Sequence, residues 1–207
     1  MTSTSEIVFI VDDDESVRKS ISLFLKASGY TVEQLRSAEE YLERGVYDGV
    51  GCLILDVHLG GKTGLELQKE LLSMNSQLPI IFITGQGDIH MSVQAIKNGA
   101  VNFLEKPFSN DELVQSISEA LILSRKLKTH KEEFDKCRLL IDALTPREYQ
   151  ILTLLITGML NKQIAGELGI VEHTVKLHRQ SICEKLGVHS VPELIYIKNA
   201  AENVFTD

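Results

Sequence analysis

The first 108 residues alternate short apolar runs with amphipathic stretches. Five runs, most of them rich in β-branched side chains, are Ile7–Val11, Thr31–Leu35, Cys52–Leu55, Ile80–Thr84 and Val101–Leu104. Runs of this length are typical of strands buried on both faces of a parallel sheet. Because amphipathic stretches separate the runs, the repeated units imply right-handed crossovers between parallel strands. The pattern therefore predicts an α/β fold: a doubly wound, five-stranded parallel sheet.

The stretch between the first two runs predicts an amphipathic helix. Val17, Ile21, Phe24 and Leu25 fall on one stripe at helical spacing. Gly29 follows directly after this stretch, where a residue without a side chain ends helices readily. We therefore expect one helix to fill the first crossover and to end just before Gly29.

After Leu144 the pattern becomes helical. Thr145, Pro146 and Glu148 are typical of a helix start, with Thr at the N-cap, Pro at the first position and Glu closing a capping box. The helical segments that follow are punctuated by Gly158, Gly169 and Gly187. No stretch in this half has a strand-like pattern. The second half therefore predicts a small all-α domain.

The segment between the two halves also predicts a helix. It contains no Gly or Pro between Pro107 and Pro146, and Ser109 with Glu112 forms another capping box. Apolar residues recur in it every seven positions, at Leu113, Ala120, Leu127, Phe134 and Ile141. Their companion positions are polar, which argues against a two-stranded coiled coil. We expect the last helix of the first domain to run on toward the second.

The polar residues of the first half stand at the ends of the predicted strands. They are Asp12, Asp13 and Asp14 after the first strand, Asp56 at the third, Thr84 at the fourth and Lys106 after the fifth. The carboxyl ends of strands line the ligand crevice in open α/β sheets. Several carboxylates in one crevice favour a hard cation such as Mg²⁺, and Lys106 could then help to neutralise a phosphoryl group brought to Asp56. Asp14 alone is expected to be a helix cap.

Composition and charge narrow the classes of function. The chain is 43% hydrophobic and 24% charged, has three widely spaced cysteines, and starts without a basic region typical of a signal peptide. We expect a cytoplasmic protein that does not enter the membrane. The net charge is −8, with 12 basic against 18 acidic residues up to Lys128 and 9 against 11 after it. Any DNA contact must therefore come from a local face, since neither half carries a basic coat.

The motifs VDDD, LILDVHLGGKTG, FITG and EKPF, in this order, resemble the receiver domain of two-component response regulators. The similarity spans about residues 5–125, and GQGDIHMSVQAIKNGAVNFLEKPF resembles the FixJ branch. The resemblance implies that Asp56 is the phosphoacceptor, and that Mg²⁺ binds Asp13, Asp56 and the backbone carbonyl of His58, with Asp12 acting through water. It further implies that Thr84 binds the phosphoryl group, Lys106 pairs with it, and Phe103 is the aromatic switch residue.

Two positions depart from the receiver pattern. Gly60 stands where the family usually has Pro, which should loosen this loop. His58 is a titratable group beside the expected acyl phosphate. It is interpreted first as a solvent-facing loop side chain, because its family role needs only the carbonyl. The alternative is that its imidazole affects how water reaches the phosphoaspartate.

The second half, from Leu144 to Val204, resembles the LuxR/NarL-type helix-turn-helix domain. The resemblance assigns Asn161–Leu168 as the first helix of the motif and Glu172–Leu186 as the recognition helix. Gly166 is expected to let these two helices approach closely. The two resemblances together imply a receiver domain over residues 1–125, a helical linker over 126–143 and a helix-turn-helix domain over 144–207.

The recognition helix has two predicted faces. Val175, Ile182 and Leu186 form an apolar stripe, with His178 and Arg179 at its edges. The opposite face carries Lys176, Leu177 and Gln180, which suit the base edges of a major groove. Candidate phosphate contacts are Lys162, Thr174 and Arg179.

These features predict a transcription factor controlled by phosphorylation, and an activator in particular. The resemblance implies a sensor histidine kinase that phosphorylates Asp56, promoter DNA and RNA polymerase as further partners, and a homodimer formed on phosphorylation. Beyond this self-phosphorylation chemistry we expect no enzyme activity. A phosphatase of the haloacid-dehalogenase kind would need a second Asp at position 58, which is His58. A regulator that senses a small molecule would need an apolar pocket, whereas this crevice is acidic.

Overall fold

The computed structural model describes residues 6–85 and 89–202. The chain divides into two compact units, Met1–Lys128 and Thr129–Asp207. The first unit is built on one sheet, and the described part of the second is helical.

The first unit contains a five-stranded, all-parallel sheet in the order β2-β1-β3-β4-β5. Its strands are β1 (Ile7–Val11), β2 (Thr31–Leu35), β3 (Gly51–Asp56), β4 (Ile80–Thr84) and β5 (Asn102–Glu105). The predicted doubly wound α/β fold is confirmed, and each of the five apolar runs forms a strand. The run at Val101 begins one residue later than predicted and extends to Glu105.

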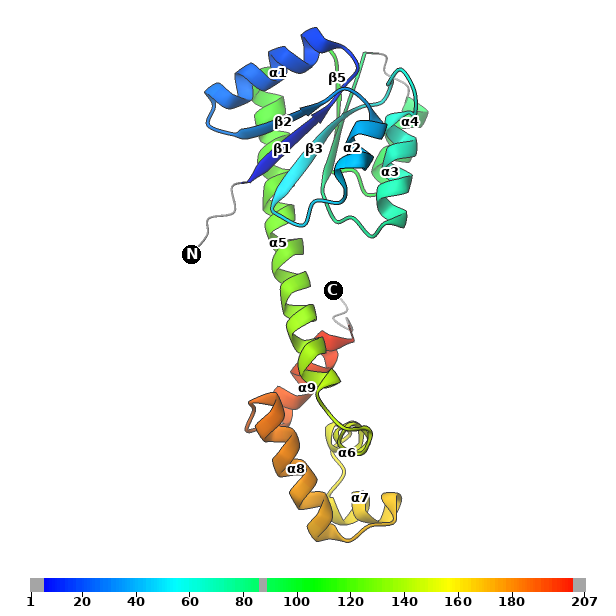
Figure 1. Cartoon of the computed structure of the whole chain (residues 1–207), viewed down its shortest axis with the longest axis vertical. Helices are drawn as coiled ribbons and strands as arrows, with labels where there is room; N and C mark the ends of the chain where they lie inside the picture. Colours follow the sequence, from blue (N-terminus) through cyan, green and yellow to red (C-terminus); the bar gives the residue numbers. More distant parts are fainter. Residues whose placement is uncertain (1–5, 86–88, 203–207) are drawn as a thin grey trace. The chain divides into compact units, whose positions relative to one another are not determined.

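The helices cover both faces of this sheet (Figure 1). They are α1 (Glu15–Ala27), α2 (Ala38–Arg44), α3 (Gly64–Ser73), α4 (Ile89–Lys97) and α5 (Asn110–Asp142). One core lies between the sheet and α2, α3 and α4, and includes Phe9, Leu53 and Phe82. The other lies between the sheet and α1 and α5, and includes Ile10 and Ile54. Neighbouring residues of β1 and β3 thus alternate between two separate cores, as expected for buried parallel strands.

Burial differs between central and edge strands. Strands β3 and β4 are buried along their whole length, and β1 is buried from its second residue onward. In β2 only Leu35 is buried, and in β5 only Leu104 is. The prediction that all five runs are buried on both faces was therefore wrong for β2 and β5. These two strands form the edges of the sheet, where one side lacks a neighbouring strand.

Helix α1 begins and ends as the sequence predicts. The Asp14 carboxylate accepts hydrogen bonds from the backbone N–H groups of Ser16 and Val17, at 2.8 and 3.3 Å. Asp14 is therefore the N-cap of α1. At the other end Gly29 has a φ of 91°, in the region that favours glycine.

Helix α5 is one continuous helix from Asn110 to Asp142, and the boundary between the two units falls inside it. The Ser109 backbone N–H and hydroxyl each donate to Glu112 at 2.8 Å, which forms the predicted capping box. In the first unit Leu113 and Ala120 are buried in the sheet core. In the second unit Ile141 packs against the helical core.

The second unit continues with α6 (Pro146–Ile156), α7 (Asn161–Leu168), α8 (Glu172–Leu186) and α9 (Val191–Ala201). Its core includes Ile151, Leu155, Ile164 and Ile182. The bounds of α7 and α8 are those predicted. The expectation for Gly166 was wrong: it is exposed, and a Cβ placed there would meet no heavy atom of another helix within 4 Å. Across the described ranges, no helix is both long and apolar enough to span a membrane.

Candidate functional site

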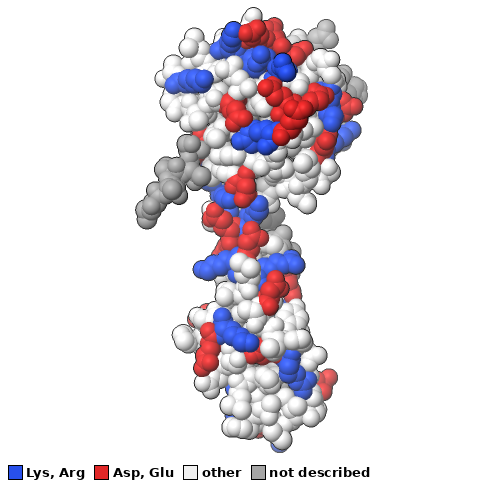
Figure 2. All heavy atoms as spheres, in the orientation of Figure 1, with Lys and Arg blue, Asp and Glu red and all other residues white. Residues whose placement is uncertain are grey.

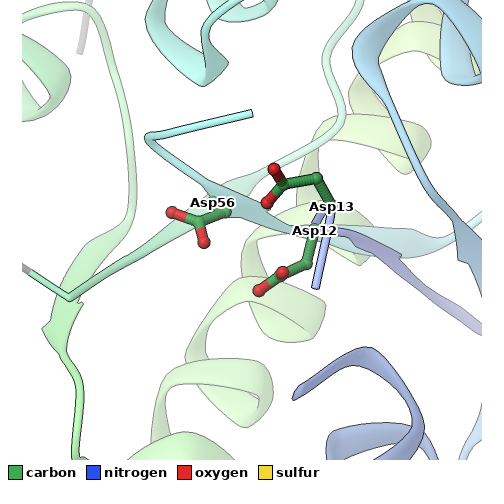
Figure 3. Close-up of side chains that lie close together, drawn as sticks. All are labelled: Asp12, Asp13 and Asp56. Carbon is green, nitrogen blue, oxygen red and sulfur yellow. The ribbon is translucent and has the colours of Figure 1, made fainter. Parts of the chain in front are cut away.

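Three carboxylates meet at the carboxyl edge of the sheet (Figure 3). Asp12 and Asp13 directly follow β1, and Asp56 is the last residue of β3. The two strands are neighbours, with Val11 paired to Leu55, so their ends lie side by side. One carboxylate oxygen from each of the three aspartates lies within 4.8 Å of the others. This arrangement suits a hard divalent cation, for which carboxylate oxygens are the usual ligands.

Lys106, which follows the edge strand β5, contacts two of the three carboxylates. Its ammonium group donates to Asp12 Oδ2 at 2.8 Å and to Asp56 Oδ2 at 2.7 Å. Its backbone N–H donates to the carbonyl of Thr84 at 2.7 Å, which anchors the residue after β5 to the end of β4. Asp12 is fully buried and Asp56 is 7% exposed. Lys106 is therefore a charged partner for two carboxylates that have little access to water.

The electrostatics of the site follow from this burial. Burial raises the pKa of Asp12, and the hydrogen bond and charge of Lys106 oppose that shift. Burial alone would lower the pKa of Lys106, but its hydrogen bonds to Asp12 and Asp56 outweigh burial and raise the pKa. One ammonium faces three carboxylates, so the ionised site carries an excess of negative charge. A bound cation would neutralise part of this negative charge, which is the role that the sequence predicts for Mg²⁺.

The other predicted receiver residues lie on β4, on β5 and on the loop after β3. Thr84 is buried at the end of β4. Phe103 is half-buried on β5, with its ring centroid 6.3 Å from that of Phe82. The side chain of His58 is exposed, and its backbone N–H donates to Asp56 Oδ1 at 3.1 Å. A Cβ at Gly60 would lie 3.5 Å from Asp13 Oδ2, so this position has room for a side chain.

Two residues that support the site were missed at the level of sequence. Gly64 begins α3, and a Cβ there would lie 2.2 Å from the carbonyl oxygen of Asp56. Arg18 of α1 donates to the carbonyl oxygen of Asp12 at 2.5 Å. The capping box Thr63–Glu66 could have located the start of α3. No local pattern, however, indicates that α3 passes against the backbone of Asp56.

Helix α8 presents a second candidate surface. Val175, Ile182 and Leu186 are buried in the helical core. The three candidate base contacts, Lys176, Leu177 and Gln180, are exposed on the helix. Lys176 pairs with Glu172 at 3.2 Å, and Gln180 donates to Glu184 at 2.9 Å. The structure therefore places all three predicted side chains on the open side of α8.

The predicted phosphate contacts differ in how available they are. Lys162 is exposed near the start of α7, and Thr174 is half-buried in the first turn of α8. Arg179 is half-buried and donates to Asn161 Oδ1 at 3.4 Å, which joins α8 to the first residue of α7. On the face drawn in Figure 2, basic and acidic side chains are interspersed over the described residues of the second unit. Any DNA contact there would be local.

Two family models match the chain. Residues 8–118 match the response regulator receiver domain, and residues 142–197 match the bacterial regulatory proteins of the luxR family. Nodulation protein W of Bradyrhizobium diazoefficiens is 42% identical over 193 residues, which cover 93% of this chain and 85% of that protein. Response regulator protein TodT of Pseudomonas putida is 39% identical over 197 residues, which cover 95% of this chain and 87% of that protein.

Solved structures agree with these matches. Response regulator StyR superposes with a TM-score of 0.84 at 43% identity, covering 95% of this chain and 99% of that chain. Full-length FixJ from B. japonicum gives a TM-score of 0.57 at 32% identity, covering 98% and 99%. The chain therefore belongs to the DNA-binding two-component response regulators of the FixJ/LuxR kind, which implies a histidine kinase as its partner. Two of the relatives are named as regulators, TodT as a response regulator protein and FixJ of Azorhizobium caulinodans as a transcriptional regulatory protein.

Proposed function

We propose that Asp56 is the phosphoacceptor of this response regulator. A carboxylate oxygen of Asp56 attacks the phosphorus of a phosphohistidine on the partner kinase, the P–N bond breaks, and an acyl phosphate forms. The observation that supports this assignment is the meeting of Asp12, Asp13 and Asp56 with Lys106 at the carboxyl edge of the sheet. A phosphoryl group adds negative charge, and Lys106 is the cationic side chain already in contact with the acceptor.

The donor set fits Mg²⁺. Asp13, Asp56 and the backbone carbonyl of His58 would hold it directly, and Asp12 would take part through water. When bound, Mg²⁺ would neutralise charge that develops on the transferred phosphoryl oxygens. Thr84 at the end of β4 would then bind the phosphoryl group, and Phe103 on the adjacent edge strand would change packing with it.

Phosphorylation can be tested directly. Full-length protein incubated with acetyl phosphate and Mg²⁺ should gain one acid-stable, base-labile phosphoryl group, detected by intact-protein mass spectrometry. Asp56→Asn should abolish the gain, because an amide is a far poorer nucleophile than a carboxylate. Asp48→Asn, an exposed aspartate of the same unit, is the matched control and should label normally. Undiminished labelling of Asp56→Asn would refute the assignment.

We further propose that α8 reads promoter DNA in the major groove. Lys176, Leu177 and Gln180 would contact base edges, since all three are exposed opposite the buried stripe of the helix. Phosphate contacts would come from Lys162 on α7 and from Thr174 and Arg179 on α8.

A panel of single-base operator variants, measured at several salt concentrations, tests this orientation. Gln180→Ala and Lys176→Ala should each cost about 1–3 kcal/mol on the preferred site and relax preference at one or two base pairs. Lys162→Ala should instead weaken binding to all sequences similarly and reduce the salt dependence by about one unit. If both α8 variants keep the wild-type base preference, the orientation is wrong.

We infer that phosphorylation of Asp56 favours a homodimer that binds paired half-sites, recruits RNA polymerase and activates transcription. The second unit has no excess of positive charge to attract DNA, with 9 basic against 11 acidic residues after Lys128. A dimer that presents two copies of α8 would supply the missing affinity. We place the receiver domain at residues 1–125 and the helix-turn-helix domain at 144–207, with 126–143 as the helical linker. Sedimentation with and without acetyl phosphate tests the dimer, and a promoter fusion in a reporter strain tests activation. Unchanged mass on phosphorylation would count against the dimer.

A further inference from the structure

Glu148 is a buried carboxylate outside the acidic site. It lies in the first turn of α6 and is 4% exposed. Its Oε1 accepts from the hydroxyl of Ser181 at 2.7 Å, and its Oε2 accepts from the ammonium of Lys185 at 2.6 Å. Both donors belong to α8. A single carboxylate of α6 thus holds two side chains of the helix that is proposed to read DNA.

The contacts to α8 exceed what helix capping requires. Glu148 closes a capping box with Thr145, whose backbone N–H donates to Oε2 at 2.8 Å. The same box occurs at Thr63–Glu66 and at Ser109–Glu112, where the backbone N–H of the N-cap residue also donates at 2.8 Å. In those two boxes the glutamate is exposed. Capping therefore needs neither the burial of Glu148 nor its bonds to another helix.

The position of the two donors on α8 defines what Glu148 restrains. Ser181 and Lys185 are one turn apart and, at about 100° per residue, lie on the flank between the buried stripe and the exposed face. The buried stripe packs through apolar contacts, which have no strong directional preference. The N-cap of α8 is Val171, which supplies no side-chain bond. Hydrogen bonds to Glu148 are directional, and they therefore oppose rotation of α8 about its axis.

A small rotation would matter for reading bases. Side chains extend about 5–6 Å from the axis of a helix, so a rotation of about 20° moves their ends by roughly 2 Å. Hydrogen bonds to base edges tolerate shifts of only a few tenths of an ångström. A helix free to rotate would keep its charge near DNA but lose the fixed geometry that distinguishes one base pair from another.

We infer that Glu148 is a positioning residue for DNA recognition: by holding Ser181 and Lys185 it sets the rotation of α8 and thus which side chains meet the bases. This inference rests on the proposed function of α8. Glu148 itself lies in the contact between α6 and α8, so it would affect the preferred DNA sequence without touching a base.

The test compares Glu148→Gln with Glu193→Gln in the full-length protein. Glu193 closes the corresponding turn of α9, is exposed, and accepts from the His189 backbone N–H at 2.8 Å. Each variant loses one negative charge in the same unit. If only charge mattered, both variants would therefore bind every DNA sequence more tightly, and by a similar factor. The probes are duplexes selected from a random library by the wild-type protein, their single-base variants, and a non-specific duplex.

Glu148→Gln should bind the selected duplex about tenfold more weakly, bind the non-specific duplex at least as well, and lose preference at several base pairs. Glu193→Gln should keep the wild-type preference. Equal preference in Glu148→Gln and wild type would overturn the inference while leaving the proposed function intact. A wild-type protein that selects no sequence would overturn both.

A double variant tests the same contact from the side of α8. If Glu148→Gln fails to fold, as judged by circular dichroism, the double variant Ser181→Ala/Lys185→Met removes both donors of α8 and leaves the capping box intact. It should show the same loss of preference. Retained preference in a folded double variant would overturn the inference.

Discussion

Replacing Lys106 by Met should destabilise the first unit strongly in the absence of divalent cations. The substitution keeps most of the aliphatic stem and removes the ammonium that contacts Asp12 at 2.8 Å and Asp56 at 2.7 Å. At an effective dielectric of about 20, each contact corresponds to roughly 6 kcal/mol of Coulomb attraction. Most of that attraction offsets the cost of burying the charges. Removing one partner of such a buried group costs about 3–5 kcal/mol, which is the loss we expect.

The matched control is Lys19→Met. Lys19 pairs with Glu15 at 2.5 Å, but both side chains are more than 60% exposed. Water screens such a pair, so its loss should cost less than about 1 kcal/mol. Adding Asp12→Asn to Lys106→Met should recover part of the stability, because it removes one of the two carboxylates left without the ammonium. Mg²⁺ should also recover part of it by neutralising them.

Urea unfolding of the full-length protein in EDTA measures these effects. Hydrogen exchange of the amides of β1 and β3 reports the first unit separately from the helical unit. The chain contains no Trp, so a fluorescence probe would have to rely on its tyrosines. If Lys106→Met loses no more stability than Lys19→Met, Lys106 does not compensate the buried carboxylates and the reasoning fails.

Three further changes have expected outcomes. Gly64→Ala should destabilise the first unit by about 1–3 kcal/mol, because the new Cβ would lie 2.2 Å from the Asp56 carbonyl oxygen. It should also slow the labelling of Asp56 by acetyl phosphate. Normal stability and normal labelling of this variant would contradict the prediction. Val171→Ser should stabilise the second unit by about 0.5–2 kcal/mol in thermal unfolding, because it supplies the side-chain cap that α8 lacks; an unchanged melt would show that the N-terminus of α8 is satisfied in another way. The bonds from Lys185 and Ser181 lower the pKa of Glu148 to about 2 from 4.5. The stability that this carboxylate contributes is therefore complete above pH 4.5 and is lost as the pH falls toward 2. Over this range the amides of α6 and α8 should lose protection from hydrogen exchange. In Glu148→Gln, this protection should depend less on pH.

The strands and helix starts follow from local features of the sequence. An apolar, β-branched run such as Ile80–Thr84 is typical of a buried strand. Asp14 and Thr145 each cap a helix that begins at the next residue. Once the strand order of a doubly wound sheet is adopted, the ends of β1 and β3 are neighbours. The meeting of Asp12 with Asp56 is therefore predictable without any knowledge of side-chain packing.

Contacts between elements distant in the chain were decided only by the tertiary structure. Gly64 and Gly166 both lie in helices, α3 and α7, and close approach was expected at Gly166 alone. The structure places backbone against Gly64 and open space at Gly166. The reason is that available space depends on the neighbouring element, whereas the local preference of glycine is the same at both positions.

The three capping boxes show the same division. Glu66, Glu112 and Glu148 have one local pattern and one local hydrogen-bond geometry. The helix starts at Ser109 and Thr145 were predicted from this pattern, and the same pattern is present at Thr63. Only the packing of α6 against α8 buries Glu148 and brings Ser181 and Lys185 to it. A local rule determines a bond to the adjacent turn because chain connectivity keeps the partners close. Bonds across 33 and 37 residues depend on how the helices pack, and that was settled by the fold as a whole.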